Sequence, residues 1–111
     1  MSRYYSEEQL INAISRLTRQ RLTRYLEHDF ITPAHSEHGP RYGMADLTRL
    51  ELICDLSDQF DLQDDAMGVV LSLIDQLHGV RAELRALMQV IDAQPDPQRR
   101  QIIAALKSRL G

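Results

Sequence analysis

A heptad pattern of apolar residues dominates the second half of this 111-residue chain. Alternating steps of three and four residues from Met67 meet eight positions, seven of them apolar: Met67, Val70, Ile74, Leu77, Arg81, Leu84, Met88 and Ile91. This spacing places the side chains along one stripe of a long α-helix, which is the pattern by which helices pair. A second apolar row lies beside the first: Ala66, Leu73, Val80 and Leu87. We therefore predict one long helix over 64–93, and we call its heptad stripe the seam.

The length of this helix limits how it can pack. At about 1.5 Å per residue it spans roughly 45 Å, whereas a compact domain of ~100 residues has a radius of ~13 Å. Part of it is expected to leave the globule or to lie against another chain. The predicted dimer contacts are Ile74, Leu77, Arg81, Leu84, Met88 and Ile91. The alternative is an ordinary buried bundle helix, which the charge of Arg81 in the seam disfavours.

The first part of the chain predicts a helix-turn-helix. Ser6 is followed three residues later by Gln9, which is the pattern of a capping box at a helix start. Thr18 is placed to cap a second short helix that runs to about Glu27. Two short helices with a tight joint between them are typical of a helix-turn-helix whose second helix presents polar side chains outward. In such a fold, the outward side chains expected to meet DNA are Arg19, Gln20, Arg21 and Arg24.

A loop and three further helical segments follow. Pro33 ends the second helix, and the apolar ends Phe30-Ile31 and Tyr42 are placed to pair across the loop as a small β-wing. Asp46 is expected to cap a third helix, and Asp64-Asp65 the long one. Pro97 begins a short amphipathic helix that either folds back or docks on a dimer mate. We predict an all-α chain with three parts in one folding unit: 1–63, 64–93 and 96–111.

Acidic residues gather in the middle of the chain. Residues 44–66 contain one base, Arg49, and seven acids: Asp46, Glu51, Asp55, Asp58, Asp61, Asp64 and Asp65. Helix starts favour acids, which accounts for Asp46, Asp64 and Asp65. That preference does not cover Glu51, Asp55 and Asp58, which fall on the outer side of the third helix with only Arg49 nearby to offset them. Such a stripe is either a solvated face or a contact for a basic partner.

Several classes of protein are disfavoured by the same sequence. The one cysteine, Cys54, excludes an internal disulfide and suits a reducing compartment. Residues 1–10 lack the apolar core of a signal peptide, and no apolar run is long enough to cross a bilayer. We find no phosphate loop, no nucleophile with a base, and no set of metal ligands around His35 and His38. A cytoplasmic protein without enzymatic activity, cofactor or metal is expected.

The order of these pieces resembles the MerR-like winged helix-turn-helix fold, and more closely the short CbpM-type chaperone modulators, a branch of that fold. The segments that carry the resemblance are 5–14, 30–33, 41–43, 46–53, 60–62, 71–78 and 81–87. It covers about residues 4–92. A MerR activator usually has a longer coiled coil and an effector site with several cysteines, and this chain departs from that pattern.

The resemblance implies a homodimer that binds the J-domain of a DnaJ-like (CbpA-type) co-chaperone and blocks its engagement of the Hsp70 chaperone DnaK. J-domains share a basic second helix, so the partner contacts expected here are the acids of the third helix and its end: Glu51, Asp55, Asp58 and Asp61. Charge reversal at Asp55 and Asp58 is expected to weaken that binding. The alternative is a MerR-like DNA-binding transcriptional regulator that uses the outward set of the second helix together with Arg41 of the wing.

Overall fold

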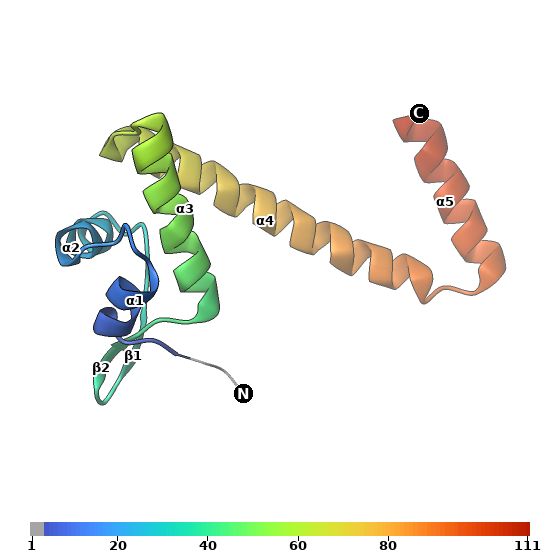
Figure 1. Ribbon diagram of the computed structural model, residues 1–111. Helices are drawn as coiled ribbons and strands as arrows, with labels where there is room; N and C mark the ends of the chain where they lie inside the picture. Colours follow the sequence, from blue (N-terminus) through green and yellow to red (C-terminus); the bar gives the residue numbers. More distant parts are fainter. Residues whose placement is uncertain (1–3) are drawn as a thin grey trace. The chain divides into compact units, whose positions relative to one another are not determined.

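The computed structural model describes residues 4–111, so the first three residues of the N-terminal segment lie outside the described part. The described chain is mostly helical, with one two-stranded antiparallel sheet (Figure 1). Its elements are α1 (Glu7–Ala13), α2 (Arg19–Glu27), β1 (Ala34–Ser36), β2 (Gly39–Arg41), α3 (Met44–Phe60), α4 (Asp64–Asp92) and α5 (Asp96–Leu110). A helical chain with a small wing-like hairpin was predicted, and this coarse architecture is confirmed. The chain divides into a first unit that ends at Ser72 and a second that begins at Leu73.

The predicted helix starts are confirmed where a side chain provides the cap. The Ser6 hydroxyl accepts a hydrogen bond from the backbone N–H of Gln9 at 3.2 Å, and the Gln9 side chain accepts one from the Ser6 N–H at 2.8 Å. Thr18 accepts from the Arg21 N–H at 3.1 Å. Asp46 was expected to be the N-cap of α3, but Gly43 occupies that position. Asp46 lies in the first turn, and its carboxylate accepts from the Gly43 N–H at 2.8 Å.

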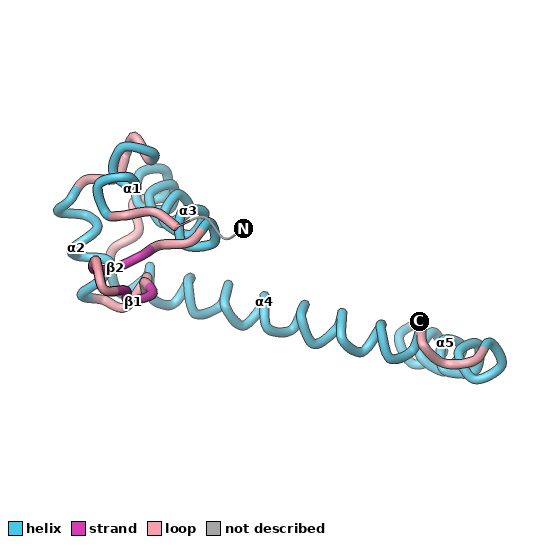
Figure 2. The backbone as a smooth tube through the Cα atoms, turned by 90° about the horizontal axis from the view of Figure 1, so that it is seen from below, coloured by secondary structure: helices cyan, strands magenta, loops and turns pink. Residues whose placement is uncertain are grey.

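The hairpin uses different residues from those predicted. Its register pairs Ala34 with Arg41 and Ser36 with Gly39, and Figure 2 shows the two short strands in magenta. Tyr42 does not pair with Phe30-Ile31. Continuing the register would place it opposite Pro33, which has no N–H to donate. Tyr42 instead exchanges two backbone hydrogen bonds with Tyr5, at 2.7 and 2.9 Å.

The core of the first unit draws on every helix of that unit. Its buried members are Leu10, Ile14, Leu17, Leu22, Tyr25, Phe30, Ile31, Tyr42, Leu50, Ile53, Cys54, Met67 and Leu71. Met67 and Leu71 come from the first turns of α4, so the start of the long helix belongs to this core. Burying such a side chain contributes roughly 1.5–3 kcal/mol, which holds the first turns of α4 in the core of the first unit.

The second unit consists of the remainder of α4 and of α5. The predicted long helix is confirmed as the 29 residues of α4, drawn as one continuous helix in Figure 2. In α5, Pro97 is the second helical residue rather than the first, and Asp96 precedes it. Arg99 Nη2 lies 2.5 Å from Asp96 Oδ1. Among the helices of residues 4–111, none combines the length and hydropathy that a bilayer crossing requires.

Candidate functional site

Two acids of α3 form ion pairs with arginines of α2 and of the joint before it. Arg16, in the joint between α1 and α2, pairs with Asp55, and its Nη1 lies 3.8 Å from Asp58 Oδ2. Arg21 of α2 holds the other oxygen of Asp58 at 2.6 Å. The expectation that Arg49 alone offsets these acids was therefore wrong. The opposing charges are distant in sequence, and the packing of α1 and α2 on α3 brings them together.

This network shifts the pKa values of three of its members, Arg16, Arg21 and Asp58. The hydrogen bond from Arg21 is the main cause that lowers the pKa of the Asp58 carboxyl. The same bond raises the pKa of Arg21 above its ordinary value, against a smaller opposing effect of burial. The hydrogen bond to Asp55 likewise raises the pKa of Arg16. Arg16, Arg21 and Asp58 are therefore charged at neutral pH, and the two arginines offset much of the local excess of acid.

The low pKa of Asp58 predicts a loss of stability in acid. A carboxyl whose pKa is lower in the folded than in the unfolded state adds stability that is fully present above the unfolded value, 3.8, and is lost as the pH falls below it. We expect the melting temperature to drop as the pH falls below about 4. The variant Arg21→Met should have a lower melting temperature than the wild type at pH 7. Its melting temperature should also fall by less between pH 7 and pH 3, as measured by circular dichroism. An equally steep loss in both proteins would show that the ion pair is not responsible.

Two of the four acids predicted to contact the J-domain form no ion pair within residues 4–111. Glu51 is exposed on the outer side of α3. Asp61 is exposed at the C-cap of α3, in a left-handed conformation with φ of 52°. Neither carboxylate forms an ion pair with another residue of the part that the structure describes. Of the four acids expected at the partner contact, Asp55 and Asp58 are engaged within the chain, while Glu51 and Asp61 present open carboxylates to solvent.

The arginines proposed to contact DNA are also engaged. Arg19 Nη1 lies 3.4 Å from Glu7 Oε2, and Arg21 is held by Asp58. Arg24 Nε is 3.5 Å from Asp64 Oδ1, whose other oxygen is 3.1 Å from His28 Nε2. Gln20 is exposed. In the wing, Arg41 Nε donates to the Ser36 hydroxyl at 3.3 Å. Each arginine of α2 therefore faces an acidic side chain of its own chain.

Sequence reasoning missed the roles of Arg16 and Arg49. Arg49 Nε donates to the carbonyl oxygen of Phe30 at 2.6 Å, so it joins α3 to the segment after α2. Arg16 follows the buried Ile14 in a short joint between two helices. A cation in a tight helix-turn-helix joint was the available signal for Arg16. The sequence carries no comparable signal for a bond from Arg49 to a backbone carbonyl nineteen positions away.

The predicted seam is largely exposed in the single chain. The side chains of Leu77, Leu84 and Met88 are 49%, 56% and 44% exposed. Arg81 is exposed, Ile74 is half-buried, and Ile91 is buried. The neighbouring row of Leu73, Val80 and Leu87 is exposed as well. An apolar stripe, interrupted by Arg81, thus remains exposed along α4 from Leu73 to Met88.

Comparisons with known proteins were made with family models, curated proteins and solved structures. None of the three found a match. The geometry of the described residues is therefore the only guide to the site. Residues 4–111 also contain no group of three or more side chains arranged to hold a metal ion.

Proposed function

We propose that this protein is a CbpM-type chaperone modulator that binds the J-domain of a DnaJ-like co-chaperone and prevents that domain from engaging Hsp70. The observation that carries the proposal is the charge of the first unit. Residues 1–72 contain twelve acids and seven arginines, whereas residues 73–111 contain four acids and six bases. The arginines of α2 are already paired with acids of the same chain. The surplus carboxylates of this unit suit a basic protein surface.

The fold belongs to the same proposal. We infer a MerR-like winged helix-turn-helix in which α1 and α2 form the helix-turn-helix and β1–β2 forms the wing. The third helix then packs on both, and α4 carries the dimer seam. The supporting observations are the order of the elements, the shared core of the first unit and the antiparallel hairpin between α2 and α3.

The partner surface is centred on the open carboxylates of Glu51 and Asp61. Asp55 and Asp58 contribute through their remaining lone pairs, because a carboxylate accepts up to about four hydrogen bonds and Arg16 and Arg21 use only some of them. A basic helix of the J-domain lies against this surface. Inhibition is by competitive exclusion, so it needs neither turnover nor a cofactor, and it depends on the relative affinities of the J-domain for this protein and for Hsp70.

The homodimer forms through the exposed stripe of α4. Leu77, Leu84 and Met88 lose their contact with water when a second copy covers them, and each such burial favours association. Arg81 keeps its guanidinium at the edge of the interface while its aliphatic stem packs within it. Buried Ile91 contributes to the second unit rather than to the interface.

DNA binding by a MerR-like regulator is the second candidate. The observation in its favour is a shallow depression of about 650 Å³ on the outward face of α2, lined by Arg19, Gln20, Thr23, Arg24 and Glu27. The excess of acid in the same unit weighs against it, since phosphate contacts dominate DNA affinity and need uncompensated positive charge.

Calorimetric titration separates the two candidates. We expect a purified J-domain with a basic second helix to bind the full-length dimer, with an affinity that falls as salt is raised. A duplex taken from the DNA upstream of its own coding sequence should bind weakly or not at all at low salt. Tight binding of the duplex with a steep salt dependence, together with no heat from the J-domain, would reverse the assignment in favour of the regulator.

A further inference from the structure

The outer face of the wing carries a pocket that the proposed partner site does not use. It has a volume of about 270 Å³ and is lined by Tyr4, Ala34, His35, Ser36 and Arg41, and we call it the wing pocket. A second depression of about 420 Å³ adjoins it and shares Tyr4. The other residues that line this second depression are Tyr5, Gln9, Asn12 and Ala13. All these residues belong to the first unit, and none belongs to α3.

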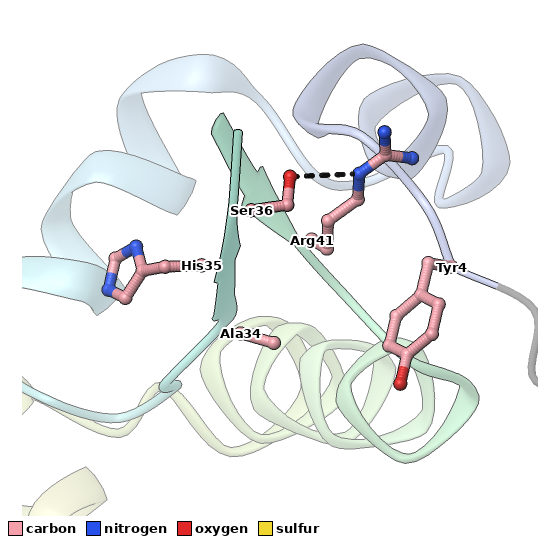
Figure 3. A pocket seen from close by; sticks show the side chains of 5 residues that line it. All are labelled: Tyr4, Ala34, His35, Ser36 and Arg41. Carbon is pink, nitrogen blue, oxygen red and sulfur yellow. Dashed lines mark hydrogen bonds between the residues drawn. The ribbon is translucent and has the colours of Figure 1, made fainter. Parts of the chain in front are cut away.

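The guanidinium of Arg41 is oriented by the hairpin. Its Nε donates to the Ser36 hydroxyl at 3.3 Å, shown as the dashed line in Figure 3. Ser36 is itself held, because it donates to the Gly39 carbonyl at 2.8 Å and accepts from the His38 N–H at 3.3 Å. The two terminal nitrogens of Arg41 point away from Ser36 (Figure 3). Within residues 4–111 no carboxylate forms an ion pair with Arg41, so its forked end is open to an oxyanion.

An aromatic side chain, Tyr4, lies on the same side of the hairpin as Arg41 and lines the same pocket. The backbone bridge between Tyr5 and Tyr42 directs the buried Tyr42 inward, and side chains alternate along a strand, so Tyr4 and Arg41 share the outer face. Figure 3 shows Tyr4 and Arg41 on one side of the hairpin and His35 on the other. The Tyr4 side chain is 51% exposed. The wing pocket therefore combines one oriented guanidinium with an aromatic wall.

We propose that the wing pocket binds the C-terminal residue of a peptide. The α-carboxylate lies against the terminal nitrogens of Arg41, whose planar fork matches a carboxylate. The side chain of the same residue packs against Tyr4 and Ala34. Ligand pockets usually measure about 300–1,000 Å³, so a volume near the lower limit suits one residue. Because the carboxylate and the side chain of a terminal residue branch from one carbon, they can extend in different directions, one toward the guanidinium of Arg41 and the other toward Tyr4, which both line this pocket.

The adjoining depression receives the preceding residues of the peptide. Asn12 offers an amide that both donates to and accepts from a peptide backbone. The Gln9 oxygen is already used by the cap at Ser6. A nucleic acid is a poorer occupant than a peptide, because the acidic first unit repels a chain of phosphates, whereas a single carboxylate meets a local cation. This proposal does not depend on the J-domain assignment.

The test is an NMR titration of the full-length dimer with acetyl-alanyl-leucine, which has a free carboxylate. Saturable shifts are expected at the backbone amides of residues 34–39 and 41 and at the Arg41 Nε–H. Arg41→Met should weaken binding about tenfold or more, and Tyr4→Ala should weaken it too, while Arg85→Met in the second unit serves as the matched control.

Three comparison ligands make the outcome decisive. The C-terminal amide of the same dipeptide removes only the charge and is expected to leave the wing resonances in place. Equal shifts with this amide, with inorganic phosphate or with a short DNA duplex would overturn the proposal, as would an absence of shifts with the acid. Dispersed spectra of each variant establish that a lost response reflects the missing side chain and not unfolding.

Discussion

The double variant Glu51→Lys/Asp61→Lys is expected to bind the J-domain on the order of 100-fold more weakly than the wild type. Both carboxylates are exposed and have no ion pair in the part of the chain that the structure describes. Reversing them places two cations against a basic partner and removes two attractive contacts. Because neither side chain supports the core, the melting temperature should change little. Isothermal titration calorimetry at low and moderate salt measures the loss.

A matched control distinguishes this surface from a general charge effect. Glu27→Lys/Glu37→Lys makes the same change in net charge at exposed acids outside α3. It should alter J-domain affinity only slightly, and the difference should shrink as salt rises. Equal losses in the two double variants would mean that net charge and not the α3 surface attracts the partner. No loss in either would remove the acidic surface from the proposed function.

Charge reversal at Asp55 and Asp58 is a less selective experiment than the sequence suggested. Each of these carboxylates pairs with an arginine of α2 or of the joint before it. A lysine there would face Arg16 or Arg21 and repel it, so weaker binding would be mixed with a weaker packing of α1 and α2 on α3. Glu51 and Asp61 avoid this ambiguity.

The variant Leu77→Asp/Leu84→Asp is expected to dissociate the dimer, with a dimer Kd at least roughly 1,000-fold higher. Each leucine is about half exposed in the single chain and becomes buried in the proposed interface, and burying one leucine is worth roughly 1.5–3 kcal/mol. Four leucines are lost per dimer, and four carboxylates are introduced along the seam. Analytical ultracentrifugation over a range of concentrations measures the change, and helical content by circular dichroism should be retained.

The control for the seam is Val90→Asp. Val90 lies on α4 outside the heptad seam and is 60% exposed, so the same type of substitution should leave the dimer intact. A monomeric wild-type protein at micromolar concentration would contradict the dimer proposal directly. Dissociation by Val90→Asp to the same extent would show that a different face of α4 forms the contact.

The sequence by itself determined the local elements of this protein. The capping signals at Ser6 and Thr18 and the heptad repeat of α4 act through neighbours within a few positions, so they can be recognised without tertiary contacts. The seam, the helix-turn-helix and the existence of a hairpin were predicted on this basis. The backbone partner of Tyr42 was not, because its bonds with Tyr5 join residues 37 positions apart.

Only the tertiary structure decided which charges remain free. In the sequence, the acids of 44–66 and the arginines of 16–24 look like two separate surfaces, one for a basic partner and one for DNA. Packing α1 and α2 on α3 joins them through Arg16, Arg21, Asp55 and Asp58, whereas Glu51 and Asp61 form no ion pair within residues 4–111. Coulomb attraction acts over distance in space and not along the chain, so the pairing of these charges follows from the packing of the helices and from no local pattern.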